Sequence, residues 1–96
     1  MSSENAVSTE EEFLKVAGGS SPQSVASAIA HALYVDNHVK IRAIGASAVN
    51  QAVKALAIAR GFVATRGQNL VCWPGFMTIE GNDSDISAIV FIVTSS

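Results

Sequence analysis

Apolar and polar residues follow two different periods along this chain, and each change of period marks a new element. A period of two predicts a strand, whereas apolar residues three and four positions apart predict a helix. Strands are expected at Glu12–Ala17, Val39–Ile44, Asn69–Glu80 and Ile86–Thr94, and helices at Pro22–Val35 and Ala46–Gly61. The predicted order of elements is therefore βαβαββ.

The first strand and helix are separated by a strong break. Leu14 and Val16 face one side of the strand, and Phe13 and Lys15 face the other. In the following GGSSP segment, a serine stands directly before proline, which is typical of a helix start: Ser21 caps the helix and Pro22 occupies its first position. The expected buried stripe of this helix is Val25, Ala28, Ile29, Ala32 and Leu33.

The second strand alternates and then passes through Gly45 into an alanine-rich helix. One face of the strand carries Val39, Ile41 and Ala43, and the other carries Lys40, Arg42 and Ile44. The helix is expected to bury Val49, Ala52, Val53 and Leu56. Gly61 is the natural residue to end it, because glycine readily takes the left-handed conformation that follows many helices.

The last two strands differ in character. The third is interrupted by Trp73-Pro74-Gly75, which predicts either an edge strand or a bulge, because proline cannot donate to a central ladder. Gly81-Asn82-Asp83 forms the hairpin turn. The fourth is a continuous apolar run, typical of a sheet centre.

These elements predict an α+β two-layer sandwich. Right-handed crossovers place both helices on one face of a mixed four-stranded sheet in the order 1-2-4-3, with the first two strands parallel. No helix remains to cover the second face.

Length and composition bound the class of protein. Ninety-six residues predict one domain, residues 12–96, after an acidic tail at 1–11 that we expect to be disordered. With 49% apolar residues and so small an interior, part of the apolar surface is expected at a subunit interface, as in a homodimer or tetramer. One cysteine, no signal peptide and no long apolar run predict a cytoplasmic protein with no membrane partner.

Charge is distributed unevenly along the chain. Residues 13–79 hold all six basic residues against one acid, Asp36, which gives this segment a formal charge of +5. Both flanking segments are acidic. This distribution permits a polyanionic partner without requiring one.

No pattern for catalysis or metal binding is present in the sequence. His31, His38 and Cys72 lack metal-ligand spacing, and no nucleophile is paired with a base. We therefore expect neither enzymatic activity nor a cofactor or metal.

The two helix starts form the main candidate site. Because parallel neighbouring strands each run into a helix, both helix N-termini are expected at one end of the sheet, where backbone N–H groups can bind phosphate. Ser20, Ser21 and Ser47 supply hydroxyls there, and Asn50 and Lys54 follow on the second helix. Alternatively, the serines only cap and turn the chain, and Asn50 and Lys54 are only solvated or lie in a dimer contact.

Other candidate residues lie elsewhere. Lys15 and Arg42 share one sheet face, where they either bind a polyanion or only keep an uncovered face soluble. Arg66 lies in a polar loop and is a candidate phosphate contact. Trp73 and Phe76 either stack on bases or cover an edge or interface.

Two segments, Leu14–Leu33 and Ile41–Phe76, carry a recognisable pattern that includes IGASAVNQAVKALAIARGF. The chain resembles the stage V sporulation protein S family of bacteria, whose members look like the Alba superfamily of nucleic-acid-binding proteins with the same βαβαββ order. Alba-type proteins carry lysines after the first strand and often a basic hairpin arm; here the loop Gly18–Ser21 has no lysine, and the hairpin tip is acidic.

The resemblance implies a non-enzymatic, nucleic-acid-binding regulator of sporulation or a related developmental process. DNA and RNA both remain open as ligands. A protein–protein scaffold without nucleic-acid binding is the alternative, and a small anion such as a nucleotide between the two helix starts is a third possibility.

Overall fold

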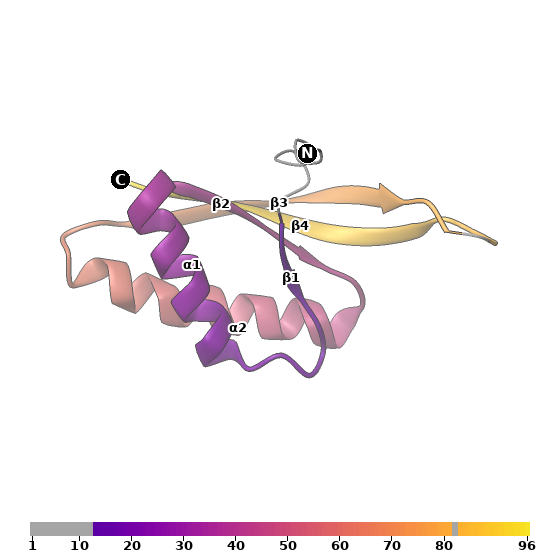
Figure 1. The fold of residues 1–96 in the computed structure, drawn as a ribbon, viewed down its shortest axis with the longest axis horizontal. Coiled ribbons are helices and arrows are strands. Elements are labelled where there is room, and N and C mark those ends of the chain that lie inside the picture. The colour runs from indigo at the N-terminus through magenta and orange to yellow at the C-terminus, as the bar shows by residue number, and fades with distance from the viewer. Residues whose placement is uncertain (1–12, 82) are drawn as a thin grey trace, which may run out of the picture.

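The computed structural model describes residues 13–81 and 83–96 (Figure 1). Its elements are β1 (Leu14–Val16), α1 (Pro22–Asp36), β2 (His38–Ala43), α2 (Ala46–Ala64), β3 (Leu70–Ile79) and β4 (Ile86–Ser95). The predicted order βαβαββ is confirmed. The predicted disordered tail, Glu12 of the first predicted strand and Asn82 of the hairpin turn lie outside the described residues.

The sheet has the predicted strand order, β1-β2-β4-β3. Strands β1 and β2 are parallel, and β4 runs antiparallel to both β2 and β3. Figure 1 shows α1 and α2 on the same side of the sheet. No helix of the described chain covers the opposite side, which we call the open face.

The core lies between the sheet and the two helices. Its largest fully buried side chains are Ile29 and Leu33 of α1, Ile41 of β2 and Val93 of β4. Each such side chain stabilises the fold by about 1.5–3 kcal/mol relative to an exposed position. Helix α2 contributes mainly alanines to this core: Ala48, Ala52, Ala55 and Ala59, together with Leu56 and Val63.

The predicted inward faces of the helices are partly wrong. Val53 is 49% exposed, and Ala28 of α1 is exposed as well. The physical reason is that α2 contacts both α1 and three strands of the sheet. Contact on two sides favours small side chains along the buried line, so the alanines face inward and the larger Val53 faces solvent.

The predicted end of α2 is also wrong. The helix continues past Gly61 to Ala64, and the left-handed residue is Gly67, with a φ of 78°. The N–H of Gly67 donates to the carbonyl of Ala64, and the N–H of Gln68 donates to the carbonyl of Val63. These two bonds form a Schellman motif, which satisfies the last carbonyls of the helix.

Strand β3 is continuous through Pro74, so the predicted interruption is absent. Pro74 stands opposite Phe91 of β4, within an unbroken register from Leu70 to Ile79. The proline is tolerated because β3 is the last strand of the sheet and needs N–H donors only toward β4. Of the two alternatives for this strand, the edge position is confirmed, and β4 is the interior strand, as predicted.

The β3–β4 hairpin extends well beyond the helices (Figure 1). Phe76 pairs with Ile89 and lies on the helix side of the sheet, yet it is 86% exposed. The hairpin therefore presents a large aromatic side chain that no other described element covers.

Candidate functional site

The start of α1 is built as the sequence predicts. Ser21 has an extended backbone, and its hydroxyl oxygen accepts a hydrogen bond of 3.3 Å from the N–H of Ser24. Pro22 takes the first helical position. The hydroxyl oxygen of Ser20 accepts from the N–H of Ala17 at 2.9 Å, which closes the preceding turn.

The two helix starts lie side by side, as predicted. The side-chain amide of Gln51 on α2 donates to the carbonyl of Ser20 at 2.9 Å. A side chain at Gly18 would collide with the hydroxyl of Ser47. The hydrogen bond from Gln51 and the close approach of Gly18 to Ser47 fill the space between the loop before α1 and the start of α2.

The hollow at this end of the sheet is consequently formed at the start of α1 alone. It has a volume of about 300 Å³ and is lined by residues of β1, α1 and the loop between them: Leu14, Lys15, Ser20, Ser21, Ser24, Val25 and Ala28. Ser47, Asn50 and Lys54 are exposed on α2 and are not part of this lining. The candidate residues of the two helix starts therefore do not share this hollow.

A second group of candidate residues meets on the open face. Residues that pair across neighbouring strands lie on the same face of a sheet. Lys15 pairs with Arg42, which in turn pairs with Val90. Lys40 pairs with Ile92, which in turn pairs with Trp73. Two adjacent rows of the open face thus bring together three cations and the only tryptophan of the chain.

Phe13 adds an aromatic ring to this group. The ammonium of Lys40 and the guanidinium of Arg42 each lie 5.9 Å from the centre of the Phe13 ring. At this distance the ring quadrupole attracts both cations weakly. Phe13 therefore helps to gather the two positive charges at the β1–β2 edge, while Trp73 stands on β3 at the other edge.

The acidic hairpin tip is too distant to neutralise these cations. Asp85 lies five positions before Val90, the partner of Arg42, and a strand rises about 3.4 Å per residue, so the separation is about 17 Å. This exceeds the Debye length of about 8 Å at physiological ionic strength. The acids of the hairpin tip therefore do not neutralise the basic group.

Arg66 lies apart from both groups. Its guanidinium stacks on Tyr34 of α1 at 3.7 Å from the ring centre. The loop that carries it is held by the Schellman motif, so the arginine is positioned against α1 and is not free in a polar loop.

The sequence analysis missed Lys40, Phe13 and Tyr34 as candidate residues. Alternation places Lys40 on the face of Arg42 and Phe13 on the face of Lys15, but neither residue was singled out as a candidate. No sequence signal links Tyr34 to Arg66, because only the packing of α1 against the end of α2 brings them together.

The reactive side chains suggest no catalytic arrangement within the described residues. The Cys72 side chain is exposed, and partial burial of its thiol raises the pKa, which disfavours the nucleophilic thiolate. Among the residues that the structure describes, no three His, Cys, Asp or Glu side chains are grouped as metal ligands.

A comparison with known protein families identifies the family of this chain. The family model described as Stage V sporulation protein S (SpoVS) matches residues 12–96. The chain belongs to the SpoVS family. It is therefore a sporulation-related protein, and SpoVS is not a known enzyme family. None of the helices that the structure describes has the length and hydrophobicity needed to span a membrane.

Proposed function

We propose that this SpoVS-family protein binds single-stranded nucleic acid across the open face of its sheet. The observation that carries the proposal is the pair of rows Lys15–Arg42–Val90 and Lys40–Ile92–Trp73. Proteins that bind single strands without sequence preference combine cations for the phosphates with aromatic rings on which bases stack. The open face offers both.

The dimensions of the face suit a single strand better than a duplex. Neighbouring strands lie about 4.8 Å apart, so the four strands offer a platform about 14 Å wide. Trp73 is 49% exposed, which leaves its ring accessible to a base. A duplex hides the faces of its bases inside the stack, whereas a single strand can place them on an aromatic ring.

Affinity is expected to be modest because few charges are involved. With three phosphate contacts, the slope of log K against log salt is about −2 for a single strand. Contacts of this kind recognise the sugar-phosphate backbone and tolerate any base sequence. The protein would then act as a general, non-enzymatic binder of nucleic acid.

Fluorescence anisotropy with labelled oligo(dT), oligo(U) and a duplex at low salt tests this proposal. The variant Lys40→Gln/Arg42→Gln is expected to weaken single-strand binding by about tenfold or more. The matched control, Lys54→Gln/Arg60→Gln, removes the same charge from exposed positions of α2 and should leave binding nearly unchanged. Equal losses in the two variants would show that the open face has no special role.

Trp73 supplies an independent readout. It is the only tryptophan, so its intrinsic fluorescence reports on this face alone. Stacking of a base should quench it, and quenching should saturate at the concentration at which anisotropy saturates. Binding in the anisotropy assay without any change in the emission of Trp73 contradicts the placement of the ligand.

A second candidate function is assembly of several copies into a scaffold. The observation that favours it is Phe76, which is 86% exposed on a hairpin beyond the helices. Light scattering coupled to size exclusion should show an oligomer that Phe76→Ser dissociates. Thr78→Ser, on the same face of β3, is the control. A monomeric wild-type protein over the whole accessible concentration range excludes this function.

A further inference from the structure

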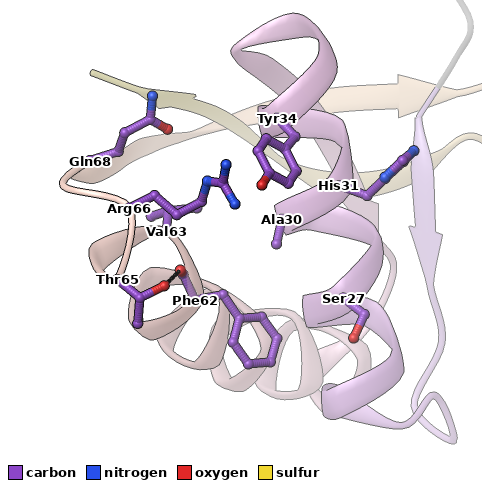
Figure 2. A pocket seen from close by; sticks show the side chains of 9 residues that line it. All are labelled: Ser27, Ala30, His31, Tyr34, Phe62, Val63, Thr65, Arg66 and Gln68. Atoms are coloured by element: carbon purple, nitrogen blue, oxygen red, sulfur yellow. Dashed lines mark hydrogen bonds between the residues drawn. The ribbon is translucent and has the colours of Figure 1, made fainter.

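A cavity of about 420 Å³ lies between α1 and the C-terminal end of α2 (Figure 2). Its lining combines one stripe of α1 with the last residues of α2 and the loop that follows: Ser27, Ala30, His31, Tyr34, Phe62, Val63, Thr65, Arg66 and Gln68. The volume falls within the range of about 300–1,000 Å³ that is usual for small-molecule sites. The cavity lies on the helical layer, away from the open face.

The cavity exists because of two features of the helices. On α1, Ala30 contributes only a methyl group to the lining, between Ser27 and Tyr34. On α2, the helix continues past Gly61, which places Phe62 at the rim, 44% exposed, and buries Val63 beneath it. A helix that ended at Gly61 would have left this wall unformed.

Among the described residues of the lining, Arg66 is the only arginine or lysine, and its position is constrained from two sides. The Schellman motif around Gly67 holds its backbone, and the ring of Tyr34 holds its guanidinium at 3.7 Å. Figure 2 shows the guanidinium of Arg66 beside the phenol ring of Tyr34. A guanidinium stacked by its face keeps its N–H donors, which lie in its plane, available for an anion.

The remaining lining is largely apolar. Phe62, Val63 and Ala30 form walls that suit a flat hydrocarbon or heteroaromatic ring. Thr65 donates its hydroxyl to the carbonyl of Phe62 at 2.7 Å, so this polar group is already satisfied. None of the described residues of the lining is a carboxylate that would repel an anion.

We infer that this cavity binds a small organic anion: a flat aromatic or heteroaromatic ring that carries one phosphate or carboxylate group. The ring lies against Phe62 and Ala30, and the anionic group accepts a bidentate pair of hydrogen bonds from Arg66. Such a ligand satisfies the charge and the apolar walls together, which a simple phosphate ion or a neutral ring alone cannot do. The site is independent of the proposed nucleic-acid surface, because the two share no residue.

The test is titration of the ¹⁵N-labelled full chain with four probes, followed by heteronuclear NMR. AMP and 4-hydroxybenzoate carry both a ring and an anion, adenosine lacks the anion, and inorganic phosphate lacks the ring. We expect saturable shifts of the Tyr34, Phe62 and Arg66 amides with at least one of the first two probes. Response to AMP alone identifies a nucleotide site, and response to both identifies a site for flat anions in general.

Variants separate the role of each wall. Arg66→Gln is expected to weaken binding of the responsive probe by about tenfold, as for loss of a charge-assisted bidentate contact. Arg60→Gln, which removes an exposed arginine of α2 that does not line the cavity, is the matched control and should bind normally. Ala30→Leu should abolish binding by filling the cavity, while Tyr34→Phe should retain it because the stacking ring remains.

Four outcomes overturn the inference. The first is the absence of saturable shifts with both ring-bearing anions. The second is equal affinity for adenosine and AMP. The third is an equal loss of binding in Arg66→Gln and Arg60→Gln. The fourth is concentration-dependent shifts of the same amides without any probe, which would show that a second copy of the chain occupies the groove. Loss of nucleic-acid binding at the open face affects none of these readouts.

Discussion

The side-chain amide of Gln51 donates a 2.9 Å hydrogen bond to the backbone carbonyl of Ser20. The bond joins the second turn of α2 to the loop that precedes α1, and it is partly buried. It holds the two helix starts together more directly than the sheet does, because β1 is only three residues long. The junction of the two βα units therefore depends on one long polar side chain.

Replacement of Gln51 by Ala should destabilise the fold by about 1 kcal/mol, the usual net value of a hydrogen bond whose carbonyl is left partly buried. The measurement is the free energy of unfolding in urea. Asn50→Ala is the control, since Asn50 is exposed, and it should change stability by less than about 0.5 kcal/mol. Similar losses at the two positions would show that the Gln51 bond is not important.

Gly18 and Gly19 should respond differently to alanine. A Cβ at Gly18 would collide with the hydroxyl of Ser47 and lie 3.2 Å from its Cβ, whereas a Cβ at Gly19 meets nothing within 4 Å. The hydroxyl can rotate away, but the contact between the two Cβ atoms persists. Gly18→Ala is therefore expected to cost about 1 kcal/mol, at the low end of overpacking effects, in the free energy of unfolding. Gly19→Ala should cost nothing measurable.

Gly61 and Gly67 should show changes of opposite sign. Gly61 lies inside α2 with free space around it, so Gly61→Ala should stabilise the fold by about 0.5–1 kcal/mol. Gly67 has a φ of 78°, and Gly67→Ala should destabilise the fold by about 1–2 kcal/mol. Thermal unfolding of the two variants measures both effects. Destabilisation by Gly61→Ala would mean that the helix ends where the sequence pattern suggested.

The Cys72 thiol should show a shifted pH dependence. Burial raises its pKa in the folded chain, so the thiolate forms at a higher pH than in the unfolded chain. Alkylation by iodoacetamide should therefore have its midpoint at higher pH in buffer than in urea. The raised pKa also implies a contribution to stability that is complete below the unfolded pKa and is lost as pH rises through the folded pKa. Coincident alkylation midpoints would contradict the raised pKa of the folded chain.

Much of the fold could be predicted from the residues. Alternation in β2 separated Ile41 from Arg42, and Ser21 followed by Pro22 marked the start of α1. The continuous apolar run of β4 indicated an interior strand, and Pro74 indicated an edge strand. Local propensity and tertiary packing agree at these positions, so short-range signals were sufficient.

The candidate site was only partly predictable. Lys15 and Arg42 could be placed on one face by parity, and their pairing follows from the parallel register. The hollow at the helix starts differs from the expectation because Gln51 reaches across and closes the gap, and side-chain reach is not visible in a pattern. The inward face of α2 differs because hydrophobicity favours Val53, whereas close packing favours alanine.

The sequence by itself determined the order of the elements, the order of the strands and the placement of Lys15 and Arg42 on the sheet face opposite Leu14 and Ile41. These properties depend on the alternation of side chains and on turn residues, which act over a few positions. The tertiary structure alone decided where α2 ends, which of its faces is buried, and that Arg66 meets Tyr34. Those outcomes depend on contacts between residues distant in the chain, where shape and packing outweigh local preference.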